Sequence, residues 1–109
     1  MTFSAFQKAA ITTAIYPGRG KNLIYPVLGL AGESGEVSEK VKKIIRDDGG
    51  EVTTEKREQI AKELGDVLWY VAAICDELRL DMGAVAEGNL AKLAARQARG
   101  TLTGSGDNR

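Results

Sequence analysis

The sequence PVLGLAGESGEVSEKVKKIIR, residues 26–46, places apolar residues about every 3.6 positions. A second stretch, IAKELGDVLWYVAAICDEL at residues 60–78, has the same spacing. This spacing gives an α-helix one apolar stripe, and the alternation typical of a half-buried β-strand is scarce in the chain. The two stretches therefore predict two long amphipathic helices in an all-α fold.

Four helices are expected from the apolar spacing and from the residues that begin and end helices. Their expected bounds are Ser4–Ile15, Pro26–Arg46, Thr53 or Thr54 to Leu80, and, after an Asp81 N-cap, up to Gly100. We expect residues 1–100 to form one helical domain. Residues 101–109 are a polar tail that should be flexible unless something holds it.

Two long and two shorter helices predict a flat four-helix bundle. In a chain of 109 residues, the flanks of the long helices would stay largely uncovered. Assembly with further copies is the usual remedy, so a homodimer or homotetramer is expected. Trp69 lies nearly opposite the apolar stripe of the third helix, and we interpret it as a residue of a subunit contact.

The composition excludes several classes of function. Lys and Arg number 15, Asp and Glu also number 15, and there is no histidine. Zero net charge argues against nucleic acid as a partner, and the lack of histidine removes Ser-His-Asp chemistry and the commonest zinc ligand. The single Cys75 allows no intrachain disulfide, and neither a signal peptide nor a long apolar run is evident. We expect a cytoplasmic protein without a membrane partner.

Two acidic pairs, Glu33 with Glu36 and Glu63 with Asp66, point to chemistry. Within each pair the carboxylates are three residues apart, which makes them neighbours on a helix surface. Both pairs lie at the shoulder of an apolar stripe, so packing of the two stripes would bring all four together. Converging carboxylates bind hard cations such as Mg²⁺. A single pair of this kind is most often a solvated surface feature, but two matched pairs make that interpretation weaker.

Further polar residues are candidates for substrate contacts. Lys40 and Tyr70 each lie one turn beyond an acidic pair, and Asn89 interrupts the apolar stripe of the fourth helix. Lys92 and Arg96, with Arg99, form a basic line that could meet phosphate oxygens. Each also has a structural interpretation. Lys40 could pair with Glu36, Tyr70 could lie at the core edge, Asn89 could be a buried hydrogen-bonding residue, and the basic line could be solvated.

Two glycines lie within the acidic motifs. Gly35 and Gly65 each cost a helix about 1 kcal/mol relative to alanine. The close approach of another helix or of a ligand would explain them both. Cys75, which lies among apolar residues, is interpreted as a packing residue.

The segments Gly29–Val37 and Lys62–Tyr70 resemble the signature of the MazG-like nucleotide pyrophosphohydrolases. These belong to the all-α NTP pyrophosphatase superfamily, which also includes the dimeric dUTPases. The signature is an E-x-x-E pair followed by an E-x-x-D pair on the next helix. Segments Asn89–Leu93 and Arg99–Asp107 resemble small single-domain members, and the resemblance covers nearly the whole chain.

The resemblance implies a MazG-type bundle, working as a dimer or dimer of dimers, that hydrolyses a (d)NTP to the monophosphate and pyrophosphate. It implies Mg²⁺, with Mn²⁺ able to substitute, and a role in cleaning the nucleotide pool. Carried over to this chain, the metal ligands are Glu33, Glu36, Glu63 and Asp66. One of them also takes the proton of the attacking water, and Glu36 is slightly favoured. Lys40, Lys92 and Arg96 would neutralise phosphates, while Tyr70 and Asn89 would hold the sugar or base.

Two other interpretations make different demands on the sequence. A non-catalytic helical interaction module would carry the same amphipathic helices, but its carboxylates would give no Mg²⁺-dependent stabilisation. A ferritin-like di-iron bundle needs Glu-x-x-His ligands, which a chain without histidine does not have. The sequence does not identify the base, although the first helix and residues 18–25 are where contacts to it are expected.

Overall fold

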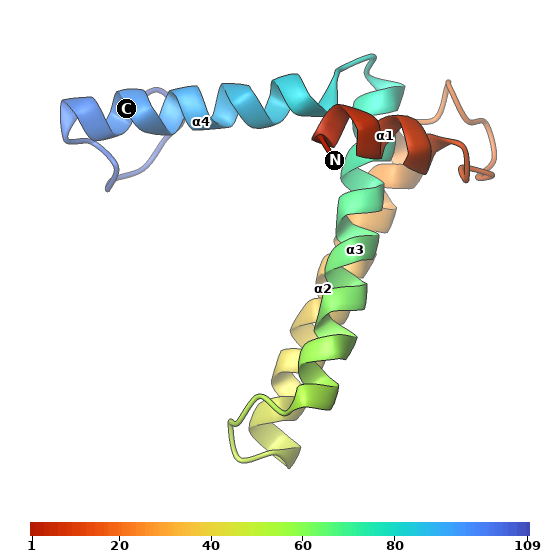
Figure 1. Cartoon of the computed structure of the whole chain (residues 1–109), viewed down its shortest axis with the longest axis vertical. Coiled ribbons are helices and arrows are strands. Elements are labelled where there is room, and N and C mark those ends of the chain that lie inside the picture. Colours follow the sequence, from red (N-terminus) through yellow and green to blue (C-terminus); the bar gives the residue numbers. More distant parts are fainter.

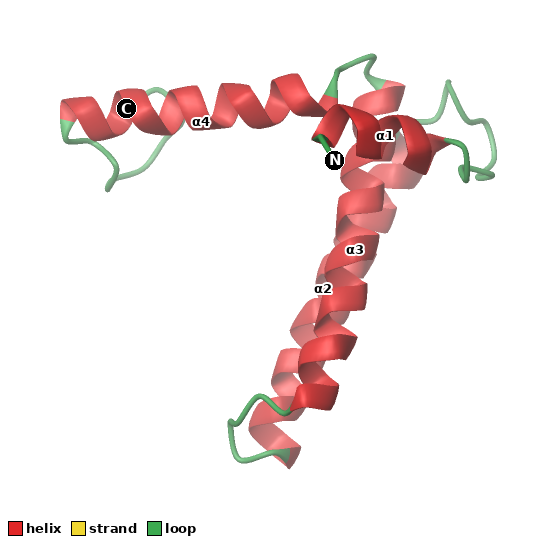
Figure 2. Cartoon of the chain, in the orientation of Figure 1, coloured by secondary structure: helices red, strands yellow, loops and turns green.

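The computed structural model describes all 109 residues and contains four α-helices and no strand. They are α1 (Phe3–Ile11), α2 (Ile24–Asp47), α3 (Thr54–Glu77) and α4 (Met82–Arg99). Figure 2 shows helices joined only by loops. The all-α class and the number of helices are confirmed. None of the helices combines the length and hydrophobicity that crossing a bilayer requires.

The long helices α2 and α3 form an antiparallel hairpin, α1 crosses its open end, and α4 extends from that end away to one side of the hairpin (Figure 1). Helix α4 contacts α1 and the end of α3 but not α2. The expected flat four-helix bundle is therefore not closed within one chain. The reason lies at the junction of α3 and α4, where Arg79 has a left-handed φ of 56° and redirects the chain.

The helix ends follow from local hydrogen bonds. The side chains of Thr53 and Asp81 accept from Lys56 N and Ala84 N, as expected of N-caps. Gly100 ends α4 with a φ of 71°, a conformation that glycine adopts without strain. The expected end of α1 was four residues too late.

Helix α1 ends early because two threonine side chains bond back to its last turn. Thr12 Oγ1 donates to Ala9 O and Thr13 Oγ1 to Ala10 O. Such local bonds offer the backbone an alternative to further helix.

The core is small and lies where α1 crosses α3. It contains Ala10, Ala72, Cys75 and Met82 in one cluster and Ile11, Ala14, Tyr16 and Ala73 in another. Trp69 packs against both clusters, and its Nε1 donates to Thr13 Oγ1 at 2.8 Å. Helix α1 of the same chain thus covers the side of α3 that carries Trp69, and the assignment of Trp69 to a subunit contact stays a prediction. Cys75 is buried, as expected of a packing residue.

Much apolar surface stays uncovered. Only 11 of 109 residues are buried, and the radius of gyration is 16.8 Å, whereas a compact domain of this size would have about 13 Å. Along one flank of the hairpin, exposed apolar side chains continue from one long helix to the other. This apolar flank comprises Val27, Val41 and Ile45 of α2 and Leu64 and Leu68 of α3.

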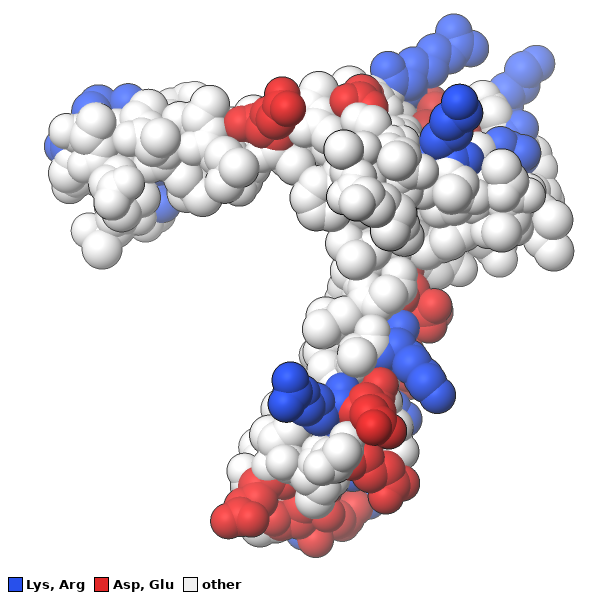
Figure 3. All heavy atoms as spheres, viewed as in Figure 1, with Lys and Arg blue, Asp and Glu red and all other residues white.

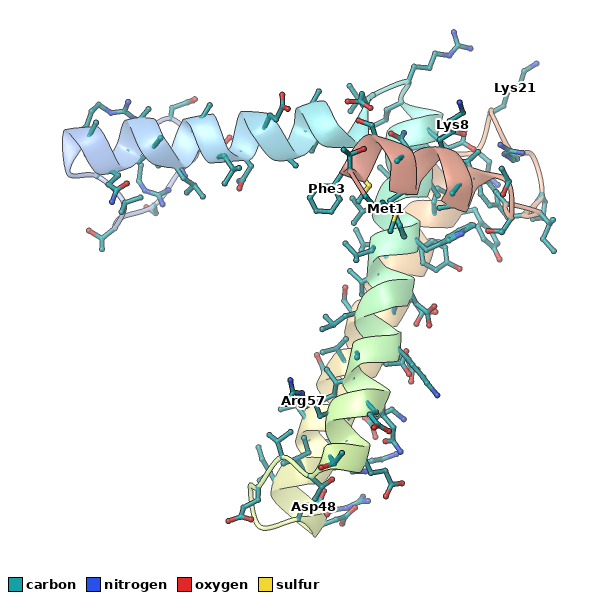
Figure 4. The ribbon with its side chains drawn as sticks, in the orientation of Figure 1. Met1, Phe3, Lys8, Lys21, Asp48 and Arg57 are labelled. Atoms are coloured by element: carbon teal, nitrogen blue, oxygen red, sulfur yellow. The ribbon has the colours of Figure 1, made fainter.

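The apolar flank continues into the corner between α3 and α4. A cavity of about 360 Å³ there is lined by six apolar residues and Asn89. Phe3 extends from α1 into this corner (Figure 4), and the inside of the corner shows no charged side chain in Figure 3. Within one chain nothing covers this surface.

Candidate metal and nucleotide site

Carboxylates from α2 and α3 converge on the opposite flank of the hairpin. Oxygen atoms of Glu33, Glu63 and Asp66 all lie within 4.8 Å of one another. The two long helices bring them together because both motifs lie at matched heights of an antiparallel pair. We call these three residues the acidic cluster.

Glu36 is not within the acidic cluster, although it is on the same helix. Its side chain is exposed one turn beyond Glu33. The alternative in which Lys40 pairs with Glu36 is not observed, since the lysines of α2 that form ion pairs are Lys42 and Lys43, both with Glu39. Glu36 and Lys40 are thus both free of an ion-pair partner beside the cluster.

Burial and neighbouring like charges disfavour ionisation of Glu33 within the cluster. Burial, followed by the charge of Asp66 and the interaction with Glu63, raises the pKa of Glu33 above its ordinary value. Like charges held close together disfavour ionisation. A cation bound among these oxygens would remove that penalty.

A cavity of about 330 Å³ opens beside the acidic cluster. It is lined by Glu33 and Asp66 on one side and by Thr13, Trp69 and Tyr70 on the other. The Trp69 and Tyr70 rings meet edge to face, with centroids 5.0 Å apart. A polar, acidic end and an aromatic end are what a ligand with a charged group and a flat ring system requires.

The Tyr70 ring packs directly against the main chain of α2 at Gly29, which has no side chain to keep it away. A Cβ at Gly29 would overlap the Tyr70 ring. Burial, followed by the charges of Tyr25, Glu33 and Asp66, raises the pKa of Tyr70, which keeps its hydroxyl protonated. In contrast, a Cβ at Gly35 or Gly65 would meet nothing within 4 Å, so no close approach within the chain explains those two glycines.

The loop between α1 and α2 is fixed by Glu77, near the end of α3. The Glu77 carboxylate accepts hydrogen bonds from the Tyr16 hydroxyl and from the main-chain N–H groups of Gly20 and Asn22. The Tyr16 hydrogen bond is the largest cause that lowers the pKa of Glu77. Tyr16 in turn stacks on Tyr25, with ring centroids 5.0 Å apart.

Three candidate substrate residues lie elsewhere. Asn89, Lys92 and Arg96 are on α4, which makes no contact with α2. Asn89 is exposed in the apolar corner without a recorded hydrogen bond, and Lys92 and Arg96 both contact Asp107 of the tail. A single chain does not bring these residues to the acidic cluster.

Sequence reasoning missed Thr13, Gly29 and Glu77. Glu77 lies on the same side of α3 as Glu63 and Tyr70, about two turns beyond Tyr70, so following that side of the helix further would have included it. The roles of Thr13 and Gly29 depend on contacts with α3 that no local pattern reveals.

Comparison with known proteins agrees with this arrangement of two acidic pairs on two long helices. The family description "MazG nucleotide pyrophosphohydrolase domain" matches residues 25–100, which span α2, α3 and α4. The chain belongs to this family. The suspected resemblance is thereby confirmed, and both acidic motifs lie inside the matched range.

A full-length relative of this MazG-family chain is known by sequence. It is 47% identical to the "Gene 37 protein" of Mycobacterium phage L5 over 114 residues, covering 100% of each chain. The name of that relative states no activity. No solved structure matches the chain.

Proposed function

We propose that the protein is a Mg²⁺-dependent nucleoside triphosphate pyrophosphohydrolase, converting a (d)NTP and water to the (d)NMP and pyrophosphate. The observation that supports it best is the acidic cluster beside an aromatic-lined cavity in a chain of the MazG family. A role in removing unwanted nucleotides from the pool would follow from this activity.

The three carboxylates fit a hard divalent cation. Oxygen ligands on opposite sides of Mg²⁺ are about 4.2 Å apart, and those at right angles are closer. The separations within the cluster, up to 4.8 Å, need only small side-chain rotations to reach that range. The donor set contains oxygen atoms alone, which suits Mg²⁺ or Mn²⁺ better than a softer metal. A bound Mg²⁺ would neutralise phosphate charge and polarise phosphoryl oxygens.

The residues then take separate roles. Glu33, Glu63 and Asp66 hold the cation, with Glu36 as a further ligand. Glu36 is exposed and outside the cluster, which leaves its carboxylate available to accept a proton from the attacking water. Lys40 lies one turn beyond and would offset phosphate charge.

The nucleoside would occupy the cavity beside the cluster. Tyr70 and Trp69 offer aromatic surface to a base, and Thr13 is the polar residue on the α1 side. The loop that Glu77 anchors adjoins this region through Tyr16, whose ring meets Trp69 edge to face. Contacts that select the base are therefore proposed in α1 and residues 18–25.

A homodimer, or a homotetramer built from it, would complete the molecule. The second copy would cover the apolar flank and the corner between α3 and α4, where a polar Asn89 lies among apolar residues. A continuous apolar surface of this kind is typical of obligate homodimers. Asn89, Lys92 and Arg96 would then act as substrate residues in a site to which α4 of a second copy contributes.

The test is a panel of normal and modified nucleoside triphosphates with Mg²⁺, scored for pyrophosphate rather than phosphate release. At least one should yield pyrophosphate, and EDTA should abolish the reaction. The competing proposal, a non-catalytic helical interaction module, predicts no turnover and no rise in melting temperature with Mg²⁺. A Mg²⁺-dependent rise that Glu63→Gln diminishes would favour the enzyme.

A further inference from the structure

The last nine residues fold back against α4 instead of extending from it (Figure 1). Asp107 accepts from Lys92 Nζ at 2.8 Å, and both its side chain and its main-chain oxygen accept from Arg96. Arg99 donates to the Arg109 main-chain oxygen at 2.7 Å. Left-handed φ values at two glycines let the tail make this return. Side chains of α4 thus hold the tail, which the sequence predicted to be flexible unless something held it.

The charges in this region are unequal. From Gly88 onward the chain carries four cationic side chains and one acidic residue, Asp107. The cationic residues are Lys92, Arg96, Arg99 and Arg109. The first three are four and three residues apart, which places them along one side of α4. We call Lys92, Arg96 and Arg99 the basic row. One carboxylate does not neutralise it.

Arg96 is buried, with only 5% of its surface exposed, which is unusual for an arginine. Its Nη2 bonds to Asp107, but its Nε is buried and has no hydrogen-bond partner. A buried guanidinium with an unused donor is costly. The Asp107 side chain, in contrast, is 78% exposed. The anion of the pair can leave readily, whereas the cation is fixed.

Hydrogen bonds from Lys92 and then Arg96 lower the pKa of Asp107. Its carboxylate therefore stays ionised near neutral pH, and the chain supplies its own anion to the basic row.

We propose that Asp107 occupies the basic row in the free chain, in place of the phosphate that the proposed function assigns to Lys92 and Arg96, so that the tail is a displaceable strap. This rests on the proposed function in one respect, the assignment of Lys92 and Arg96 to phosphate binding. A phosphoryl group has three terminal oxygens and more charge than a carboxylate, so it can engage more of the row's donors at once.

The experiment measures binding of inorganic pyrophosphate in EDTA by calorimetry, at constant ionic strength. Without a divalent cation the acidic cluster repels pyrophosphate, and the difference between the wild type and Lys92→Gln gives the part of the binding that belongs to the basic row. Asp107→Asn should bind pyrophosphate about tenfold more tightly than the wild type, because the competing charge is gone. Lys92→Gln should bind it more weakly.

Glu87→Gln is the matched control, since it removes one negative charge from α4 without touching the tail. It should stay within about twofold of the wild type. Pyrophosphate should also speed amide hydrogen exchange of residues 101–109 in the wild type. Equal affinities in Asp107→Asn and Glu87→Gln, or unchanged binding in Lys92→Gln, would overturn the proposal. Turnover with Mg²⁺ plays no part in this assay, so its failure is distinct from failure of the proposed hydrolysis.

Discussion

The two flanks of the α2–α3 hairpin differ sharply although the same two helices build them. One flank gathers Glu33, Glu63 and Asp66 beside an aromatic cavity, while the other exposes a run of aliphatic side chains. Carboxylates held together destabilise the chain until a cation joins them, and exposed aliphatic groups do so until a protein surface covers them. Both flanks therefore carry unfavourable groups in the isolated chain, and the proposed cation and second copy would relieve them.

The largest effect is expected on the acidic flank. Asp66→Asn should lower turnover by about a hundredfold or more, because it removes one charged ligand from a three-carboxylate set. Rates would be measured with Mg²⁺ on the best substrate of the panel. Glu58→Gln, an acidic residue of α3 outside the cluster, is the control and should be near wild type. Full activity in Asp66→Asn would remove the basis of the site.

The next effect concerns assembly through the apolar flank. Leu68→Glu places a charge on it and should convert the oligomer to a chain of 11.7 kDa, as measured by sedimentation at micromolar concentration. Ala91→Glu adds the same charge on the face of α4 that points away from the apolar corner, and it should leave assembly intact. A wild type that sediments as a monomer would show that the flank has another role.

A smaller effect is expected on the free energy of unfolding when Gly29, beside the first acidic motif, or Gly65, within the second, is replaced by alanine. Gly29→Ala forces the Tyr70 ring to move and should cost about 1–3 kcal/mol of unfolding free energy. Gly65→Ala meets no atom in the chain and should gain about 1 kcal/mol from helix propensity. Urea unfolding of both variants checks this. Destabilisation by Gly65→Ala would indicate that a second copy approaches α3 at that point.

The smallest effect is the pH dependence of the unfolding free energy that Glu77 causes, at the open end of the hairpin. The folded pKa of Glu77 lies below its ordinary value of 4.5, so its stabilising effect is full above that pH. It is lost as the pH falls through the folded pKa. The stability difference between wild type and Glu77→Gln should therefore be constant from pH 7 to about 5 and shrink below about 4.5. A difference that grows on acidification would contradict this assignment.

The sequence was sufficient for features that depend on neighbours along a helix. Thr53, Asp81 and Gly100 act as caps where expected, and three of the four acidic residues converge as the wheel predicted. Features set by contacts between helices were not accessible. The packing partners of Trp69 lie on α1, and a helical wheel of α3 alone does not show them. Nothing about an arginine at position 79 indicates a left-handed turn.

The distance of Asn89, Lys92 and Arg96 from the acidic cluster within one chain was also not evident from the sequence. Their positions on α4 were correct, but a wheel does not give the direction in which the helix leaves the hairpin. Whether they reach a nucleotide stays a prediction that depends on a second copy.

Gln7 of α1 holds the elbow between α3 and α4. Its side-chain amide donates to Leu80 O at 2.9 Å and accepts from Met82 N at 2.8 Å, so one residue of α1 grips both sides of the elbow before α4. Because α4 meets α3 only at its first turns, this grip sets how far the corner opens. Gln7 thus helps to fix the direction in which α4 leaves the hairpin. A change at Gln7 would alter which partner surfaces fit the corner while leaving every residue of the contact itself unchanged.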